Sequence, residues 1–233
     1  MLRIDFHCHT VCSKDSLTVL PALLKACQRK GIDKVVITDH NTIQGALEAQ
    51  KLDPGQVIVG EEIKTQQGEL LAAFVQEEVP RGLPALEAIR RLREQGAFIS
   101  VSHPFDRLRN GHWELPDLEE IASLVDAIEV FNARCMQAEF NRQASDFARH
   151  HGLAGTAGSD AHAAFEIGTA HLVLPDFAAA AGLRMALPQA QVVGKLSSPW
   201  VHFASVYARW VKAVRGNSPR PLGEGDRAKF DSG

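Results

Sequence analysis

The chain has 233 residues, 45% hydrophobic content and a formal net charge of −3, which suits one main domain with a sizeable core. The slightly acidic balance excludes a protein that coats nucleic acid or an anionic membrane, although a local basic pocket for one phosphate is compatible with it. No leader-like or membrane-spanning run is visible and the four cysteines show no paired spacing, so a cytoplasmic protein without a membrane span is expected.

Short apolar or β-branched runs alternate with helix-like patterns along most of the chain. Strands are predicted at 2–6, 35–38, 57–60, 70–75, 98–102, 127–131, 153–157 and 171–174, and helices at 17–30, 43–50, 83–95, 117–124, 137–150 and 177–187. Gly31, Gly96 and Gly152 each follow the last periodic residue of a predicted helix, where a glycine cap is common. The alternation indicates an α/β fold with a parallel sheet, either open or closed.

Three short clusters of His and carboxylate residues lie where predicted strands end, at 5–9, 38–41 and 158–162. In an extended segment, residues two apart point the same way. His7 with His9, and Asp160 with His162, therefore form two pairs of ligands. Imidazole and carboxylate groups are the ligands that Zn²⁺, Mn²⁺ and Fe²⁺ use, so the clusters predict a convergent metal site.

The candidate ligands are more numerous than one tetrahedral ion can use. They follow at least five different predicted strands, and only a closed ring brings so many strand ends around one point. The ligand positions therefore favour a barrel over an open sheet. The full set is His7, His9, Asp15, Asp39, His40, Glu62, His103, Asp160 and His162.

The order of these motifs resembles the PHP family, named for its polymerase and histidinol phosphatase members. The resemblance covers residues 1–195 and implies a distorted (β/α)7 barrel, in agreement with the alternation of strands and helices. The matching motifs are His7-x-His9, Thr38-Asp39-His40, Gly60-Glu61-Glu62-Ile63, Ser102-His103-Pro104, Glu129-Val130-Phe131-Asn132 and Gly158-Ser159-Asp160-Ala161-His162.

The resemblance also implies how the ligands divide between divalent Mn, Zn or Fe ions. It assigns His7, His9, Glu62 and Asp160 to one ion, and Asp15, His40 and His162 to a second. Asp39 is expected to orient an imidazole rather than to bind a metal directly. Two or three ions are therefore expected.

The third ion is left open by the sequence. In family members it uses the bridging glutamate, here Glu62, and His103 together with one further His. Leu70, Leu71 and Asn132 occupy the regions from which other members supply that ligand. Asn132 could still offer a carbonyl oxygen or bond a water.

The expected activity is hydrolysis of a phosphate ester by a metal-bound hydroxide, because paired metal ions stabilise the attacking and leaving oxygens of an in-line displacement. The expected partner is a small phosphorylated metabolite, a nucleotide or an oligonucleotide end. Asp160, His103 and Glu62 are predicted to be catalytic. A hydrolase of amide or cyclic C–N bonds, and a non-catalytic metal-binding module, are the alternatives.

Arg134 is the predicted bidentate contact to the substrate phosphate, with Asn132 beside it. Arg107, Arg109 and Lys64 are weaker candidates, expected to be solvated charges. The remaining histidines are excluded from the predicted site. Three of them have no clustered partner, and the adjacent pair at 150–151 ends a predicted helix beside Gly152, where positive charge suits the helix dipole. The five histidines are His112, His150, His151, His171 and His202.

From residue 196 the chain changes character. Apolar residues at 203, 206, 207, 210 and 214 follow helical spacing with basic residues nearby, which predicts an amphipathic helix over 196–216. It is expected to pack on the barrel or on a second subunit of a homo-oligomer, with a membrane surface as the alternative. Residues 217–233 are typical of a disordered tail, and residues 1–195 are predicted to form the catalytic domain.

Overall fold

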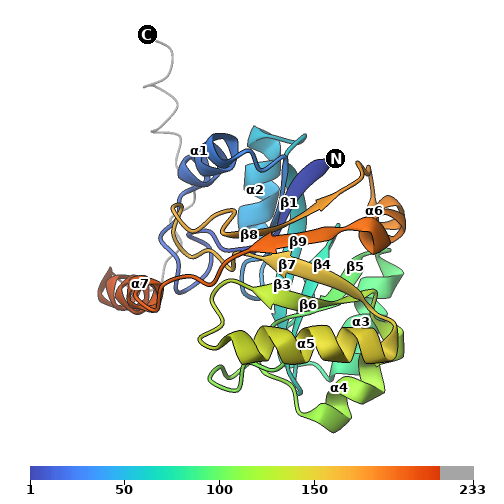
Figure 1. The fold of residues 1–233 in the computed structure, drawn as a ribbon. Coiled ribbons are helices and arrows are strands. Elements are labelled where there is room, and N and C mark those ends of the chain that lie inside the picture. The colour runs from blue at the N-terminus through green and yellow to red at the C-terminus, as the bar shows by residue number, and fades with distance from the viewer. Residues whose placement is uncertain (216–233) are drawn as a thin grey trace.

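Within residues 1–215, which the computed structural model describes, nine strands form one mixed sheet. Figure 1 shows this sheet curling at the centre of the molecule, with most helices packed around it. The strand order is β7-β6-β5-β4-β3-β2-β1-β8-β9. The strands are β1 Leu2–Cys8, β2 Lys34–Ile37, β3 Val57–Lys64, β4 Glu69–Ala73, β5 Phe98–Val101, β6 Ala127–Asn132, β7 Ala154–Gly158, β8 Ala170–Leu174 and β9 Gln191–Gly194.

The helices follow the predicted pattern closely. Gly31 and Gly152 cap two of them with φ values of 64° and 65°, and Gly96 follows a third with φ 73°. These are left-handed conformations in which glycine carries no Cβ penalty. The helices are α1 Leu20–Lys30, α2 Gln44–Leu52, α3 Ala85–Glu94, α4 Leu115–Ile121, α5 Ala138–His151, α6 Ala180–Ala186 and α7 Val201–Arg215, with 3₁₀ turns at Ala122–Leu124 and Leu187–Gln189.

The end strand β7 comes back to β1, which lies well inside the strand order. The backbone N–H of Asp160, just beyond β7, donates to the carbonyl of His7 at 2.7 Å, and Cys8 bridges Ala161 in parallel. A Cβ on Gly158 would lie 2.3 Å from the Cβ of His7, so only glycine allows this approach. The sheet is thus a nearly closed, distorted barrel, and the expected fold class is confirmed.

The sheet is mixed rather than parallel throughout. β1, β2 and β3 are parallel, as are β5, β6 and β7, but β4 runs antiparallel to both of its neighbours. Only residues 65–68 link β3 to β4, closed by a bond of 2.9 Å from Thr65 N–H to the carbonyl of Gly68. A parallel connection needs a crossover of a dozen or more residues, so this link forces a hairpin.

Both faces of the sheet carry apolar core. Val35 and Ile37 belong to the cluster shared with α1, α2 and α3, whereas Val36 faces a second cluster that contains Phe6 and Phe98. These two rings meet edge to face, with centroids 5.5 Å apart. The packed core on both faces fixes the strand ends, and the side chains that follow them are held rigidly.

The helix α7 lies at the side of the barrel, away from the other helices (Figure 1). It corresponds to the helix expected over 196–216, while the expected tail at 217–233 lies outside the described residues. The proposed boundary between a catalytic domain and this helix stays a prediction. Across residues 1–215, no helix combines the length and the apolar character needed to cross a membrane.

Candidate metal centre

One rim of the barrel gathers buried histidine and carboxylate side chains from many strands. The carboxyl ends of the parallel strands share this rim, and the antiparallel β4 brings its first residue to the same place. The loop between β1 and α1 contributes one more carboxylate. The side chains are His7, His9, Asp15, His40, Glu62, Glu69, His103, Asp160 and His162, all buried except the half-buried His40 and Glu69.

The carboxylate of Glu62 lies at the centre of this group. Its Oε2 is 3.4 Å from the Nε2 atoms of both His7 and His9, and 2.9 Å from Nδ1 of His40. Its Oε1 is 3.2 Å from Nε2 of His103. The two oxygens of one carboxylate therefore face different sets of imidazoles, which is the arrangement of a bridging ligand.

His7, His9 and Asp160 form one set beside Glu62. Oδ1 of Asp160 lies 3.2 Å from Nε2 of His9 and 3.5 Å from Nε2 of His7. The backbone of Asp160 has φ 52°, a left-handed conformation that a non-glycine residue rarely adopts. This uncommon conformation turns the carboxylate back toward β1, and such local strain is typical of functional sites.

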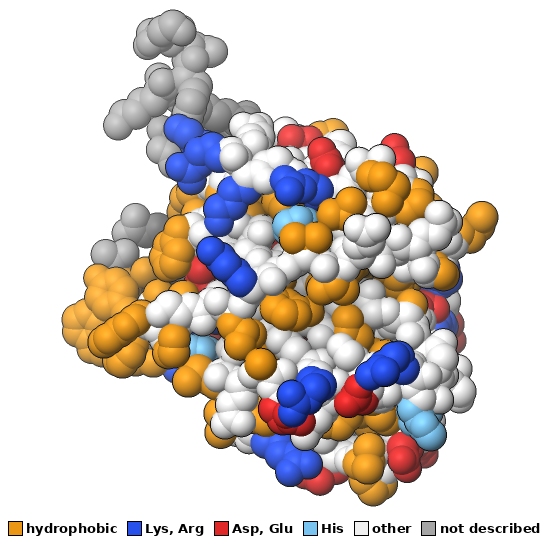
Figure 2. All heavy atoms as spheres, viewed as in Figure 1, with side chains coloured by type: hydrophobic (Ala, Val, Ile, Leu, Met, Phe, Trp, Pro, Cys, Tyr) orange, Lys and Arg blue, Asp and Glu red, His pale blue; other side chains and the backbone are white. Residues whose placement is uncertain are grey.

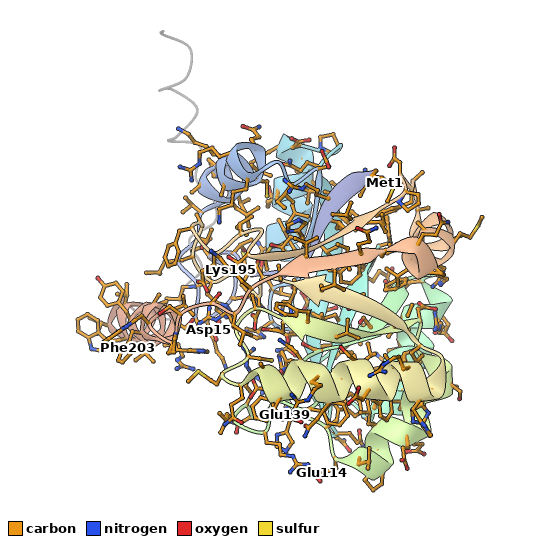
Figure 3. The ribbon with its side chains drawn as sticks, viewed as in Figure 1. Met1, Asp15, Glu114, Glu139, Lys195 and Phe203 are labelled. Carbon is orange, nitrogen blue, oxygen red and sulfur yellow. The ribbon has the colours of Figure 1, made fainter. Side chains whose placement is uncertain are left out.

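Asp15, His40 and His162 form a second set. Oδ1 of Asp15 is 3.5 Å from Nε2 of His40 and 3.4 Å from Nε2 of His162. The ring of His9 lies between them, with centroid distances of 4.4 Å to His40 and 4.2 Å to His162. Figure 3 shows Asp15 on the side of the barrel that faces α7.

Glu129 and Asn132 on β6 support the first set from behind. Glu129 Oε1 lies 3.0 Å from Nδ1 of His7, and its Oε2 accepts from the backbone N–H of His103 at 2.9 Å. The amide of Asn132 donates to Glu129 Oε2 at 3.1 Å and to Asp160 Oδ2 at 3.2 Å. A carboxylate behind a histidine fixes the ring and raises its basicity as a ligand.

Asp39 supports His9 through Ser13 and is not itself in contact with the ligand rings. The Ser13 hydroxyl donates to Asp39 Oδ1 at 2.6 Å and lies 3.1 Å from Nδ1 of His9. Thr10 also donates to Asp39, at 2.7 Å from its N–H and 2.5 Å from its hydroxyl. The carboxylate therefore organises the loop after β1, and this loop carries Asp15.

The cluster mixes imidazoles whose pKa values move in opposite directions. Burial disfavours the charged form of His7, but the carboxylates of Asp160, Glu62 and Glu129 outweigh it and raise the pKa of His7 well above its usual value. Burial and the neighbouring His162 and His40 lower the pKa of His9 well below its usual value. The surrounding carboxylates therefore stabilise the charged form of His7, whereas His9 is neutral and free to act as a ligand.

Several polar atoms of the cluster are buried without a hydrogen-bond partner. They include Oε2 of Glu62, Oδ1 of Asp15 and Nδ1 of His103. Buried polar atoms without partners are rare in proteins, and they often mark a place for an ion. Orphaned carboxylate oxygens that face imidazole nitrogens fit a divalent cation, so this donor set is suited to metal ions.

Residues 1–215 contain three groups of possible metal ligands, and in each group the ligand atoms all lie within 4.8 Å of one another. The first two groups hold the predicted histidines and Glu62, with His9 in both, while Asp160 and Asp15 lie outside the groups at 3.2–3.5 Å from ligand histidines. The third group contains Glu69, which the sequence interpretation missed. The groups are His7, His9 and Glu62; His9, His40 and His162; and Glu62, Glu69 and His103.

Glu69 directly precedes Leu70 and Leu71, the two apolar residues in the region where other family members carry the further ligand. Its Oε2 lies 3.6 Å from Nε2 of His103, and its carbonyl accepts from Ser102 N–H at 3.1 Å and from the Trp113 indole at 3.0 Å. The turn at 65–68 was the available signal, because a hairpin there places the start of β4 beside the end of β3, the strand that carries Glu62.

Two arginines lie near the rim, Arg109 with its guanidinium on Asp160 and Arg134 buried against α7. Arg109, expected to be a solvated charge, bonds through Nη1 to Oδ2 of Asp160 and through Nε to Asp106 at 3.1 Å. That expectation is wrong, because the loop after β5 folds the guanidinium back onto the rim. The guanidinium of Arg134 is buried and donates to Val201 and Ser205 of α7 at 3.2 and 2.9 Å. Phosphate contact by Arg134 stays a prediction.

The other candidate residues are not members of the ligand groups found within residues 1–215. Lys64 donates to the carbonyl of Asn110 and Arg107 is exposed. His151 stacks on Phe147 at 4.1 Å. The five histidines set aside from the sequence are absent from the three ligand groups found within residues 1–215.

Comparison with protein families decides the relationship. A model of the PHP domain matches residues 5–130, and a second, described as PHP-associated, matches residues 138–192. The chain belongs to the PHP domain family. The predicted PHP resemblance is thereby confirmed, and the matched regions together carry all the ligand side chains described above.

Relatives of this PHP chain agree in sequence and in fold. The uncharacterized protein MJ0417 of Methanocaldococcus jannaschii is 38% identical over 174 residues, which cover 73% of this chain and 70% of that protein. A two-domain protein of Bacteroides vulgatus, containing a predicted PHP-like metal-dependent phosphoesterase, matches with a TM-score of 0.69 and 19% identity over 89% of this chain and 69% of that one. PsfC of Pseudomonas syringae matches with a TM-score of 0.68 and 18% identity, covering 91% and 100% of the two chains.

Proposed function

We propose that this PHP chain hydrolyses phosphate esters with two or three divalent metal ions held at the rim of the barrel. The observation that carries the proposal is the position of Glu62, whose two oxygens face His7, His9 and His40 on one side and His103 on the other. When bound, such ions lower the pKa of water and neutralise charge that develops on a phosphoryl group.

The proposed ligands divide into three sets. Glu62 belongs to the first and third sets, and its Oε2 also faces His40 of the second at 2.9 Å. In the third set, Glu69 takes the place of the further histidine that other PHP members use and that this sequence lacks. The sets are His7, His9, Glu62 and Asp160; Asp15, His40 and His162; and Glu62, Glu69 and His103.

The two oxygens of Asp160 have separate roles in this proposal. Oδ1 faces His9 and His7 and acts as the ligand, while Oδ2 accepts from Asn132 and Arg109. Burial disfavours the charged carboxylate, but Arg109 and His7 outweigh it and hold the pKa of Asp160 well below its usual value. The carboxylate is therefore ionised at neutral pH and always available to a cation.

Arg109 is the cation best placed for the substrate phosphate. Its guanidinium already contacts a carboxylate of the rim through Nη1, and arginine suits phosphate oxygens because it presents several N–H donors in a fixed fork. Its Nε faces Asp106 at 3.1 Å and its Nη1 faces Asp160, so Nη2 is the nitrogen that would meet the substrate phosphate. Asn132 and Arg134, predicted from the sequence, remain the second candidates for this contact.

A screen of phosphate esters tests the proposal. The chain is stripped with a chelator and reloaded with Mn²⁺. Phosphorylated metabolites, nucleoside monophosphates and short oligonucleotides are then added, and released phosphate or shortened oligonucleotide is measured. We expect turnover that depends on metal and disappears in Asp160→Asn. Hydrolysis of amides or cyclic C–N bonds, with no phosphate ester turned over, would replace the phosphoesterase by the alternative hydrolase.

A further inference from the structure

An apolar stripe runs along the outer side of α7. It consists of Trp200, Phe203, Tyr207, Trp210 and Val214, all exposed, with the four aromatic side chains between 58% and 76% accessible. Figure 2 shows hydrophobic side chains gathered over α7, and Figure 3 places Phe203 on the side of the helix that faces away from the barrel. Within residues 1–215 nothing covers this stripe.

The stripe is held in place by the opposite side of the same helix. Val201, Ser205, Ala208 and Val211 are buried against the barrel. Lys212 donates to the carbonyl of Val11 at 2.6 Å and to that of Ser13. At the other end of α7 the guanidinium of Arg134 binds Val201 and Ser205. The aromatic residues are therefore presented on a rigid element rather than on a free segment.

The spacing of the stripe is that of a helix-pairing seam. The intervals between its residues are three, four, three and four, which is the a/d repeat by which two helices pack together. The flanking positions nearest the seam carry Ala204, Val206, Val211 and Ala213, and none of these is charged. A second α7 can therefore approach without bringing like charges together.

We propose that this stripe is an interface with a second copy of the chain, in which two α7 helices pack antiparallel about a twofold axis. Such an axis places Trp200 opposite Trp210 of the second copy, and Phe203 opposite its Tyr207, so large aromatic rings meet in these layers and Val214 lies beyond them. A contact of this kind is isologous and closes as a dimer. The proposal rests on α7 alone and does not depend on the proposed activity.

The exposed area is large enough for such a dimer. An aromatic side chain has about 150–250 Å² of surface, so the four aromatic residues leave about 500 Å² of apolar surface per chain at their observed exposure. This value lies at the upper end of what monomers expose, about 300–600 Å². Two copies would bury about 1,000 Å² from these residues, which reaches the lower limit for a specific interface.

A membrane surface fits the helix less well. Helices that lie in a bilayer interface need a strongly charged polar face opposite the apolar one, but in α7 that side is packed on the barrel. The ammonium group of Lys212 is already bound to backbone carbonyls. Among the described side chains of α7, Arg209 is the basic group left exposed.

Light scattering after gel filtration tests the interface on the full chain. We expect twice the 25.4 kDa of one chain at micromolar concentration. Trp210→Glu and Tyr207→Glu should each give the single-chain mass, because a charge enters the seam. The control Leu52→Glu, at an exposed position of α2, and the conservative Trp210→Phe should remain dimeric. Circular dichroism would show that the monomeric variants are folded.

Two results would overturn the proposal. One is a wild-type chain that has the mass of a monomer at every concentration. The other is a dimer whose mass is unchanged by both glutamate variants. If the wild-type monomer sediments with phosphatidylcholine–phosphatidylserine vesicles and Trp210→Glu does not, then the stripe is a membrane contact and the dimer is rejected.

Discussion

The Nε2 atoms of His7 and His9 lie 3.1 Å apart, and the two rings are tilted by 57°. The two residues are separated by one position of an extended strand, so their side chains project from the same face. Two unprotonated imidazole nitrogens are both electron-pair donors, so they cannot form a hydrogen bond with each other. Both can bind one cation placed between them. This pair defines the point on which Glu62 and Asp160 also converge.

The first prediction removes a ligand from this point. We expect Asp160→Asn and His9→Ala to lower metal-dependent turnover by orders of magnitude, because each removes a donor atom from the set around Glu62. The fold should persist, since these residues lie at the rim and not in the apolar core. Elemental analysis should show at least two metal equivalents in the wild type and fewer in the variants.

His151→Ala is the matched control for the histidine variant. His151 stacks on Phe147 at the end of α5, outside the ligand groups of residues 1–215, so turnover should stay near the wild-type rate. A loss comparable to that of His9→Ala would show that the wrong histidines have been assigned to the metal centre.

The second prediction concerns Glu69. If its carboxylate completes the third set with His103, Glu69→Gln should lower the affinity for one metal equivalent by about tenfold or more, since even residues that only orient ligands change affinity by about 10–100-fold. Chelator competition measures this loss. Glu120→Gln, on the exposed side of α4, should bind metal as the wild type does. Equal metal affinity in Glu69→Gln and Glu120→Gln would remove Glu69 from the site.

Glu69 also shows where sequence reasoning reaches its limit. The pairs His7 with His9 and Asp160 with His162 could be predicted because a strand has a fixed period of two. The position of Glu69 depends on the direction of β4, which the alternation of strands and helices does not give. The contact of Arg109 with Asp160 depends on the path of the loop after β5, and no periodic pattern encodes that path.

The strands also differ in how far the sequence pattern predicts them. Val35–Ile37 and the other buried runs are visible as short apolar segments, and their carboxyl ends indicated a closed barrel because ligands converge there. The strand β9 was missed, since its residues are exposed and it consists of only four residues. Such an edge strand is defined by its pairing with β8 rather than by burial.

The third prediction separates the two arginines. Arg109→Ala should lower kcat/KM for the best phosphate ester by about tenfold or more, or about 1.4 kcal/mol of transition-state binding, while the metal content at saturating Mn²⁺ stays unchanged. Arg109→Lys should recover part of the loss because it keeps the charge without the planar fork. Arg107→Ala, in the same loop and exposed, serves as the control.

Arg134→Ala completes that comparison. The hydrogen bonds of Arg134 to Val201 and Ser205 should make the variant less stable by about 1–3 kcal/mol in urea unfolding. A fall in kcat/KM equal to that of Arg109→Ala, without any change in stability, would instead support the phosphate contact predicted from the sequence for Arg134. Full activity in Arg109→Ala would remove Arg109 from the phosphate site.

The last prediction tests how the far side of the barrel is held together. The carboxylate of Asp126 accepts bonds from Arg93 at 2.7–2.8 Å, from Arg184 at 3.0–3.1 Å and from the backbone N–H of Ile99 at 2.9 Å. Burial alone would raise the pKa of Asp126, but the bonds from Arg184 and Arg93 outweigh it and lower the pKa. The ionised form is therefore favoured by folding, and Asp126→Asn should lower the free energy of unfolding by about 1.5–3 kcal/mol at neutral pH.

The pH dependence gives this prediction its sign. A carboxylate whose folded pKa is depressed stabilises the fold above its unfolded pKa, and this contribution is lost as the pH falls through the folded pKa. The stability difference between wild type and Asp126→Asn should thus be constant near neutrality and shrink below about pH 4. Asp146→Asn, which breaks an exposed pair with Arg149, should change stability by about 0.5 kcal/mol or less. A difference between wild type and Asp126→Asn that does not change with pH would show that the charge of Asp126 is not what stabilises this side of the barrel.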